Sequence, residues 1–198
     1  MRYGPEGGGR RVRAELGGSL FLAGPLLKLG LRTVSTNGAV FGRLGTRYAV
    51  HGGGADLWRG TAEFGAVYRP GGLGERGSVT VRVDSQDETG PWARAGIIVR
   101  NDLARAGSPG FVNLSVTPAN GVVLSYDSNG DGTLDSYRRI TGVKAPVLLR
   151  LRRAGADYTG ELSADGGASW RTVATVRVPG AAGRQDAGLG MTAAGGVA

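Results

Sequence analysis

After about residue 46, hydrophobic and polar side chains alternate along the chain in short runs separated by Gly, Pro, Asn and Asp. In residues 78–84, Val79, Val81 and Val83 fall on one face, because successive side chains of a strand point to opposite sides. Three more runs show the same period of two, at 111–116, 147–152 and 172–178. Each run predicts an antiparallel strand with one face in the core and one in solvent.

The full pattern predicts ten short strands and no helix longer than a turn at 102–105. The strands are expected at 46–51, 63–69, 78–84, 94–100, 111–116, 121–127, 135–140, 147–152, 157–163 and 172–178. Parallel sheets would need helices between the strands, and none are indicated. The predicted fold class is therefore all-β: a two-sheet antiparallel β-sandwich of the jelly-roll type.

Composition agrees with many short strands and removes some kinds of chemistry. Glycine supplies 38 of 198 residues, without a collagen-like triplet period, and such glycines serve turns and bulges. The chain has no cysteine, which excludes disulfides, thiolate metal sites and a cysteine nucleophile. Its 198 residues are enough for one domain with a sizeable core, with or without a tail.

The formal net charge of +8 is concentrated in the first part of the chain. Residues 1–47 hold eight basic and two acidic side chains, a surplus of +6, which leaves +2 for residues 48–198. A nucleic-acid footprint should cluster on one face of a folded body, whereas this surplus clusters in an N-terminal segment. Nucleic acid is therefore not expected as a partner.

Residues 1–45 are predicted to be a Gly- and Arg-rich leader, partly disordered or the end of a preceding module, before a sandwich over 46–198. Arg10, Arg11 and Arg13 precede the apolar run 19–27, but Pro25 and nearby charges make this a poor signal peptide. The run is also far shorter than the roughly 20 apolar residues of a membrane helix. No membrane span is expected.

An acidic loop at 127–135 has oxygen donors at the alternate positions that calcium loops use. The candidate ligands are Asp127, Asn129, Asp131, Asp135 and the backbone carbonyl of Thr133. Counted from Asp127, position 12 of the loop is Arg138 rather than the bidentate Glu of an EF-hand. The segments on both sides are predicted to be strands rather than helices, so this is not an EF-hand. A structural calcium site and a plain polar hairpin loop are equally compatible with the pattern.

Residues 163–170 match the Asp-box pattern S-x-D-x-G-x-[ST]-W throughout. In a hairpin turn that begins at Ser163, the Asp165 carboxylate can accept backbone N–H bonds across the loop, Gly166 and Gly167 supply positive φ, and Trp170 packs beneath. One box on about 150 residues cannot build the propeller of a sialidase. The motif therefore predicts a structural turn rather than a catalytic site.

No catalytic residues are predicted. His51 is the single histidine and stands beside three glycines, and the chain has neither a G-x-S-x-G nucleophile motif nor an E-x-D-x-E acid triplet. A glycosidase needs two carboxylates flanking one bond, and the glutamates are scattered singly. The sequence predicts a protein that is not an enzyme, with a glycan-degrading enzyme or its fragment as the alternative.

Several segments in fixed order resemble the concanavalin A-like, laminin-G-like sandwich modules of bacterial extracellular proteins. They are Gly54-Ala55-Asp56-Leu57-Trp58, Glu63-Phe64 through Val67-Tyr68, Trp92 to Arg100, Gly107-Ser108-Pro109, Thr117 to Gly121 and the Asp box. The resemblance covers about 48–192. It implies a secreted or cell-surface, non-catalytic module that binds polysaccharides or surface glycans, often beside other domains of a larger protein.

Two features depart from the family pattern. The acidic loop is longer than the usual turn, and the chain ends at Ala198 where relatives continue into a closing strand. We therefore expect either that Thr36–Gly45 supplies this strand or that a sheet edge is open, as in a fragment of a longer polypeptide.

A glycan site needs an exposed aromatic platform with polar neighbours. Trp92 with Asp87 is the first candidate, and Asp56 with Trp58 the second. Both tryptophans could instead be core residues, as large aromatic side chains usually are.

Overall fold

The computed structural model describes the backbone of residues 12–17 and residues 30–194 in full. The described residues form strands, turns and loops and contain no helix. The strands are β1 (Val12–Gly17), β2 (Arg32–Ser35), β3 (Val40–Leu44), β4 (Arg47–Gly52), β5 (Gly65–Gly74), β6 (Arg76–Val83), β7 (Ser85–Gln86), β8 (Arg94–Arg100), β9 (Val112–Thr117), β10 (Gly121–Tyr126), β11 (Ser136–Ile140), β12 (Val147–Ala154), β13 (Asp157–Ser163), β14 (Arg171–Arg177) and β15 (Arg184–Thr192).

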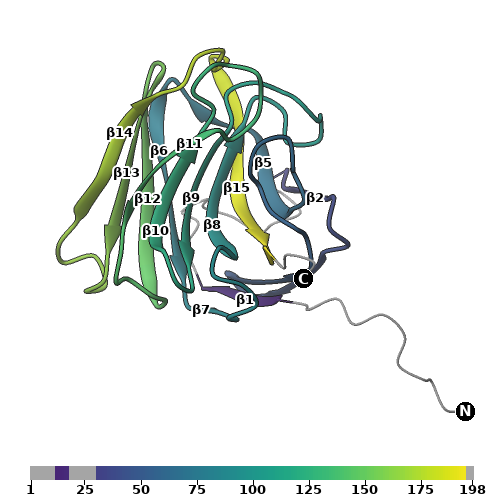
Figure 1. Cartoon of the computed structure of the whole chain (residues 1–198), viewed down its shortest axis with the longest axis vertical. Coiled ribbons are helices and arrows are strands. Elements are labelled where there is room, and N and C mark those ends of the chain that lie inside the picture. The colour runs from purple at the N-terminus through teal and green to yellow at the C-terminus, as the bar shows by residue number, and fades with distance from the viewer. Residues whose placement is uncertain (1–11, 18–29, 195–198) are drawn as a thin grey trace, which may run out of the picture.

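These strands build an antiparallel β-sandwich, which confirms the predicted fold class. One sheet has seven strands in the order β11-β10-β9-β8-β15-β5-β2, and the facing sheet has four in the order β14-β13-β12-β6. Figure 1 shows the four-stranded sheet on the left and the seven-stranded sheet curving away to β2 on the right. A third sheet, in the order β3-β4-β1-β7, lies below them in that view.

The main core fills the space between the two large sheets. Alternate residues of β6 and β12, among them Val81 and Leu149, face alternate residues of β8 and β9 such as Ile97 and Leu114, and all four are almost completely buried. The same arrangement explains why β6 and β12 alternate between buried and more exposed positions. The one-sided burial predicted for these two strands is therefore confirmed.

The opposite face of the seven-stranded sheet is also buried, which the sequence analysis did not anticipate. Leu57, Phe64, Leu103, Phe111 and Leu134 come from three loops and form a second apolar cluster against this face. As a result β8, β9 and β10 are buried at every position. The prediction that residues 111–116 have a solvent-exposed face is wrong, because these loops cover the polar side chains of β9.

All ten predicted strands are present, and β8 and β13 have the predicted limits. The analysis missed β1, β2, β3, β7 and β15. Three of these fall in the predicted leader: β1 and β3 pair with β4, and β2 pairs with β5, so strand pairing crosses residue 45. Residues 1–11 and 18–29 of the predicted leader lie outside the described residues.

The seven-stranded sheet also contains β15, a strand that the pattern did not predict, which pairs with β8 on one side and β5 on the other. Ala187, Leu189 and Met191 enter the core, while Gly188 and Gly190 occupy the alternate positions. Residues 36–45 do not enter the seven-stranded sheet, since β3 belongs to the small sheet. Because glycine is typical of turns, the sequence of β15 suggested a loop. Its apolar residues nevertheless alternate with a period of two.

Gly188 allows this close packing, and we predict that Gly188→Ala destabilises the protein. An added Cβ would lie 2.1 Å from the Val67 carbonyl oxygen and 2.5 Å from the Tyr68 Cα, so backbone must move. Overpacking of this kind costs about 1 to 3 kcal/mol. Gly74→Ala in β5 is the control, because its Cβ would meet open space. Equal urea midpoints for both variants would show that Gly188 does not limit the sheet spacing.

Candidate functional site

A pocket of about 240 Å³ opens at one end of the seven-stranded sheet, on the face turned away from the main core. Its walls are formed by Asp56, Trp58, Trp92, Arg94 and Tyr137. The volume is below the roughly 300 to 1,000 Å³ of sites for drug-sized ligands. It therefore suits one ring of a ligand, or the end of a chain, better than an extended segment.

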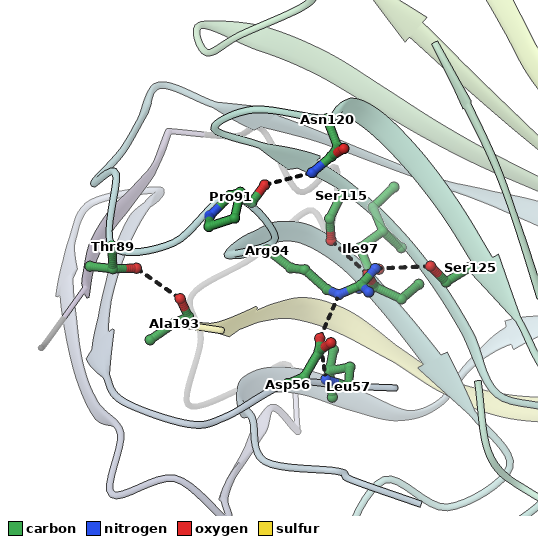
Figure 2. A network of polar contacts seen from close by, with 11 residues as sticks. Asp56, Leu57, Thr89, Pro91, Arg94, Ile97, Ser115, Asn120, Ser125 and Ala193 are labelled. Carbon is green, nitrogen blue, oxygen red and sulfur yellow. Dashed lines mark hydrogen bonds and ion pairs between the residues drawn. The ribbon is translucent and has the colours of Figure 1, made fainter. Parts of the chain in front are cut away.

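Arg94 forms the polar base of the pocket. Its side chain is 2% exposed, its Nε donates to Asp56 Oδ1 at 3.2 Å, and its Nη1 donates to Ser125 Oγ at 2.9 Å. Figure 2 shows the guanidinium between Asp56 and Ser125. Burial lowers the pKa of Arg94 from its ordinary value, and the neighbouring Asp56 carboxylate opposes this shift. An ion pair with one buried partner is costly to break, because the guanidinium would be left without a counter-charge.

The loop between β4 and β5 carries Asp56 and Trp58 to the pocket. Between them, Leu57 is 1% exposed and packs in the second apolar cluster, which anchors the loop against the sheet. Asp56 Oδ1 also accepts the Leu57 N–H at 2.6 Å, and the Arg59 N–H donates to the Leu134 carbonyl at 3.0 Å. Trp58 is thereby held at the surface, half-buried.

The loop before β8 positions Trp92. Asn120 Nδ2 donates to the Pro91 carbonyl at 2.9 Å, and Thr89 Oγ1 donates to the Ala193 carbonyl at 2.8 Å. Figure 2 shows both contacts fixing the loop to the ends of neighbouring strands. Trp92 follows Pro91 directly and is half-buried, so one part of the indole faces the pocket instead of the core.

Tyr137 of β11 lies between the two tryptophans. Its ring centroid is 5.6 Å from that of Trp58 and 5.6 Å from that of Trp92, with an interplanar angle of 71° in both pairs. Edge-to-face packing of this kind is favourable and holds the rings in a fixed orientation. Tyr137 is 38% exposed, so the cluster presents aromatic surface to solvent.

Two exposed arginines border this aromatic cluster. The guanidinium carbon of Arg59 lies 6.0 Å from the Trp58 ring, and that of Arg139 lies 5.7 Å from Trp92 and 6.0 Å from Tyr137. These distances are at the outer limit of cation–π contacts. Arg139 also donates to Asn120 Oδ1 at 2.5 Å, which holds it beside the Trp92 loop.

The structure brings together three of the four residues predicted to bind ligand: Asp56, Trp58 and Trp92. The fourth, Asp87, is exposed in the loop before Trp92 and does not line the pocket. Sequence analysis missed Arg94 and Tyr137. An arginine inside the apolar run 93–99 was a usable signal for the first, and the period of two that places Tyr137 and Arg139 on one face was a signal for the second.

The acidic loop uses its carboxylates to hold its own backbone. Asp127 is fully buried and accepts N–H bonds from Gly110, Gly130, Asp131 and Gly132 at 2.7 to 3.3 Å. Asp131 accepts bonds from Asn129 Nδ2 and from the amide and hydroxyl of Thr133. Asp135 accepts bonds from the amide and hydroxyl of Ser128.

The contacts of this loop give calcium binding no geometric support. Calcium takes six to eight oxygens at one point, whereas the Asp127, Asp131 and Asp135 side chains each serve a separate set of donors. Within residues 30–194, no three acidic, histidine or cysteine side chains are gathered as a metal site. Calcium binding by Asp127, Asn129, Asp131, Thr133 and Asp135 stays a prediction without support from the geometry.

The Asp box forms a closed turn between β13 and β14. Asp165 accepts bonds from Ser163 Oγ at 2.7 Å, from the Ser169 amide at 2.9 Å and from Ser169 Oγ at 2.5 Å, and the Gly167 amide donates to Ser163 Oγ. Gly166 and Gly167 have φ of 74° and 101°, which glycine adopts without strain. Trp170 is half-buried, with the Arg150 guanidinium 3.9 Å from its ring, on the sheet opposite the pocket.

Comparison with known proteins supports the fold and leaves the family open. No family model matches the chain, and no curated protein matches it. A Saccharomyces cerevisiae protein described as functionally unknown is similar in structure, with a TM-score of 0.62 and 15% identity over 82% of this chain and 86% of its own. Bacteroides ovatus GH43B, of a xyloglucan locus, aligns with a TM-score of 0.45 and 17% identity over 68% of this chain and 26% of its own, too weakly to carry an argument. No helix among the described residues is long and apolar enough to cross a membrane.

Asp165 should make stability depend on acid pH. Its hydrogen bonds with Ser169 and Ser163 lower its pKa from the ordinary 3.8. A lowered folded-state pKa contributes stability that is present above the unfolded value and is lost as the pH falls below about 4. The Asn side chain of Asp165→Asn does not titrate. The melting temperature of this variant should therefore fall less between pH 5 and pH 2 than that of the wild type. Asp157→Asn is the control, and identical pH profiles for the wild type and Asp165→Asn would contradict the assignment.

Asp127 should stabilise the acidic loop without a metal. We expect Asp127→Asn to lower the free energy of unfolding by about 1 to 3 kcal/mol in the presence of a chelator, since buried amides lose an acceptor. The wild type should melt at the same temperature in chelator and in millimolar calcium. If calcium instead raises the melting temperature and Asp131→Ala abolishes the effect, the loop is a metal site.

Proposed function

We propose that the protein is a non-catalytic carbohydrate-binding or cell-surface interaction module, and that its site is the pocket formed by Asp56, Trp58, Trp92, Arg94 and Tyr137. The observation that carries this proposal is the position of two half-buried tryptophans beside Tyr137, next to an ion pair whose arginine is buried. Sugar rings have apolar C–H faces and hydroxyl edges. Aromatic walls can cover the faces while charged groups at the base bond to the edges.

The pocket favours binding over hydrolysis. Glycosidases in general place two carboxyl groups about 5 to 10 Å apart across the scissile bond. Asp56 is the one carboxylate among the lining residues of this pocket, and it is bonded to Arg94. A glycan-degrading enzyme is the alternative class, and product release from a bound polysaccharide would distinguish it.

The finer assignments belong to the same proposal. The sandwich and the ordered motifs support a concanavalin A-like, laminin-G-like module. An extracellular or cell-surface location, polysaccharide or surface-glycan partners, and neighbouring domains in a larger secreted protein are what that resemblance implies. Nucleic acid is not proposed as a partner, because the body of the chain after residue 47 carries a net charge of only +2.

The test is binding to a panel of insoluble polysaccharides by pull-down, followed by titration with the best ligand. Trp58→Ala and Trp92→Ala should each weaken binding at least tenfold, which corresponds to about 1.4 kcal/mol. Trp170→Ala is the matched control, because it removes an indole from the other sheet. Equal losses in all three variants, or none in any, would show that the pocket is not the glycan site.

A further inference from the structure

We infer that the pocket is selective for acidic polysaccharides, whose sugars carry a carboxylate or sulfate group. This inference rests on the proposed function and names the class of glycan. It derives from three arginines around the aromatic cluster: Arg94 at the base, and Arg59 and Arg139 at the rim.

Arg94 retains donors that the protein does not use. Nε and one Nη1 proton are bonded to Asp56 and Ser125, and among the described residues no acceptor is bonded to Nη2. The side chain is 2% exposed and lines the pocket, and its guanidinium carbon lies 5.9 Å from the Trp92 ring, so a group bound between the aromatic walls would lie beside the guanidinium. A planar guanidinium edge matches the two oxygens of a carboxylate or sulfate, and such charge-assisted bonds are stronger than those to hydroxyl groups.

The charge around the pocket is positive after the ion pair is counted. Asp56 offsets Arg94, and the nearby Glu63, whose carboxylate accepts the Ala55 amide at 2.8 Å, offsets one further positive charge. Arg59 and Arg139 remain exposed at the rim, and neither forms an ion pair within the described part of the chain. An anionic sugar would meet this excess, whereas a neutral sugar would leave it unused.

The backbone at Arg59 is unusual for an arginine. Its φ is 44°, in the left-handed region that glycine adopts most easily, and Gly60 follows with φ of 76°. Strained residues of this kind are concentrated at ligand sites, where the side chain has a use. Arg59→Gly should therefore keep or raise the melting temperature while weakening the binding of an acidic glycan. A lower melting temperature would show that the arginine is needed for the loop instead.

The experiment compares trigalacturonate with its methyl-esterified form, in which each carboxylate is replaced by an uncharged methyl ester. Titrations at about 0.15 M salt, where the screening length is roughly 8 Å, limit non-specific attraction to this basic protein. The wild type should bind the acid at least tenfold more tightly than the ester. A parallel titration with a sulfated trisaccharide shows whether sulfate serves as well as carboxylate.

Two variants of equal net charge locate the effect. Arg139→Gln at the rim should weaken trigalacturonate binding about tenfold, as expected for a lost charge-assisted bond. Arg171→Gln, on an exposed part of β14 in the other sheet, should change it less than about twofold. Equal losses in both variants would mean non-specific attraction and would overturn the inference.

The outcomes separate this inference from the function on which it rests. Equal affinity for the acid and the ester, with loss in Trp58→Ala and Trp92→Ala, would overturn the preference for acidic sugars and leave the glycan site in place. If either ligand binds to Trp58→Ala and Trp92→Ala as tightly as to the wild type, the proposed function itself is overturned.

Discussion

The burial of both faces of the seven-stranded sheet is the constraint on which the rest of the structure depends. Three loops cover the outer face with Leu57, Phe111, Leu134 and their neighbours, so polar groups on that face lose contact with water. A buried polar group is costly unless it is hydrogen-bonded. Asn113 and Ser115 of β9 meet this requirement by bonding to the Ile97 carbonyl and to each other.

The same constraint places an arginine at each end of β8. Arg100 donates to the carbonyls of Ser108 and Gly132 and packs 4.6 Å from Phe111, so it joins two of the covering loops. Arg94 is bonded to Asp56 and Ser125 and lies where the cover ends and the pocket opens. Arg100 therefore joins the covering loops, while Arg94 lines the pocket.

The period of two was enough to predict the sandwich and ten of its strands, because one-sided burial leaves an alternating pattern. The period of two did not predict strands in which the alternate positions are filled by glycine. At β15, Gly188 and Gly190 fill alternate positions because neighbouring strands approach closely, and glycine reads as a turn. Asp56, Trp58 and Trp92 could be chosen by residue type, but their meeting with Tyr137 depends on the pairing of β10 with β11, which local sequence does not reveal. In the acidic loop, the alternate carboxylates that suggested calcium accept hydrogen bonds from backbone amides of the loop itself.

The central claim is that a ligand sugar sits against Trp58 and Trp92 above Arg94. Its most direct test is tryptophan emission from the Trp170→Phe variant, in which every remaining indole lies at the pocket. Saturation with trigalacturonate should shift this emission to shorter wavelength and protect it from quenching by acrylamide, because the sugar excludes water from both rings. Unchanged emission and quenching at a ligand concentration that calorimetry shows to be saturating would contradict the account.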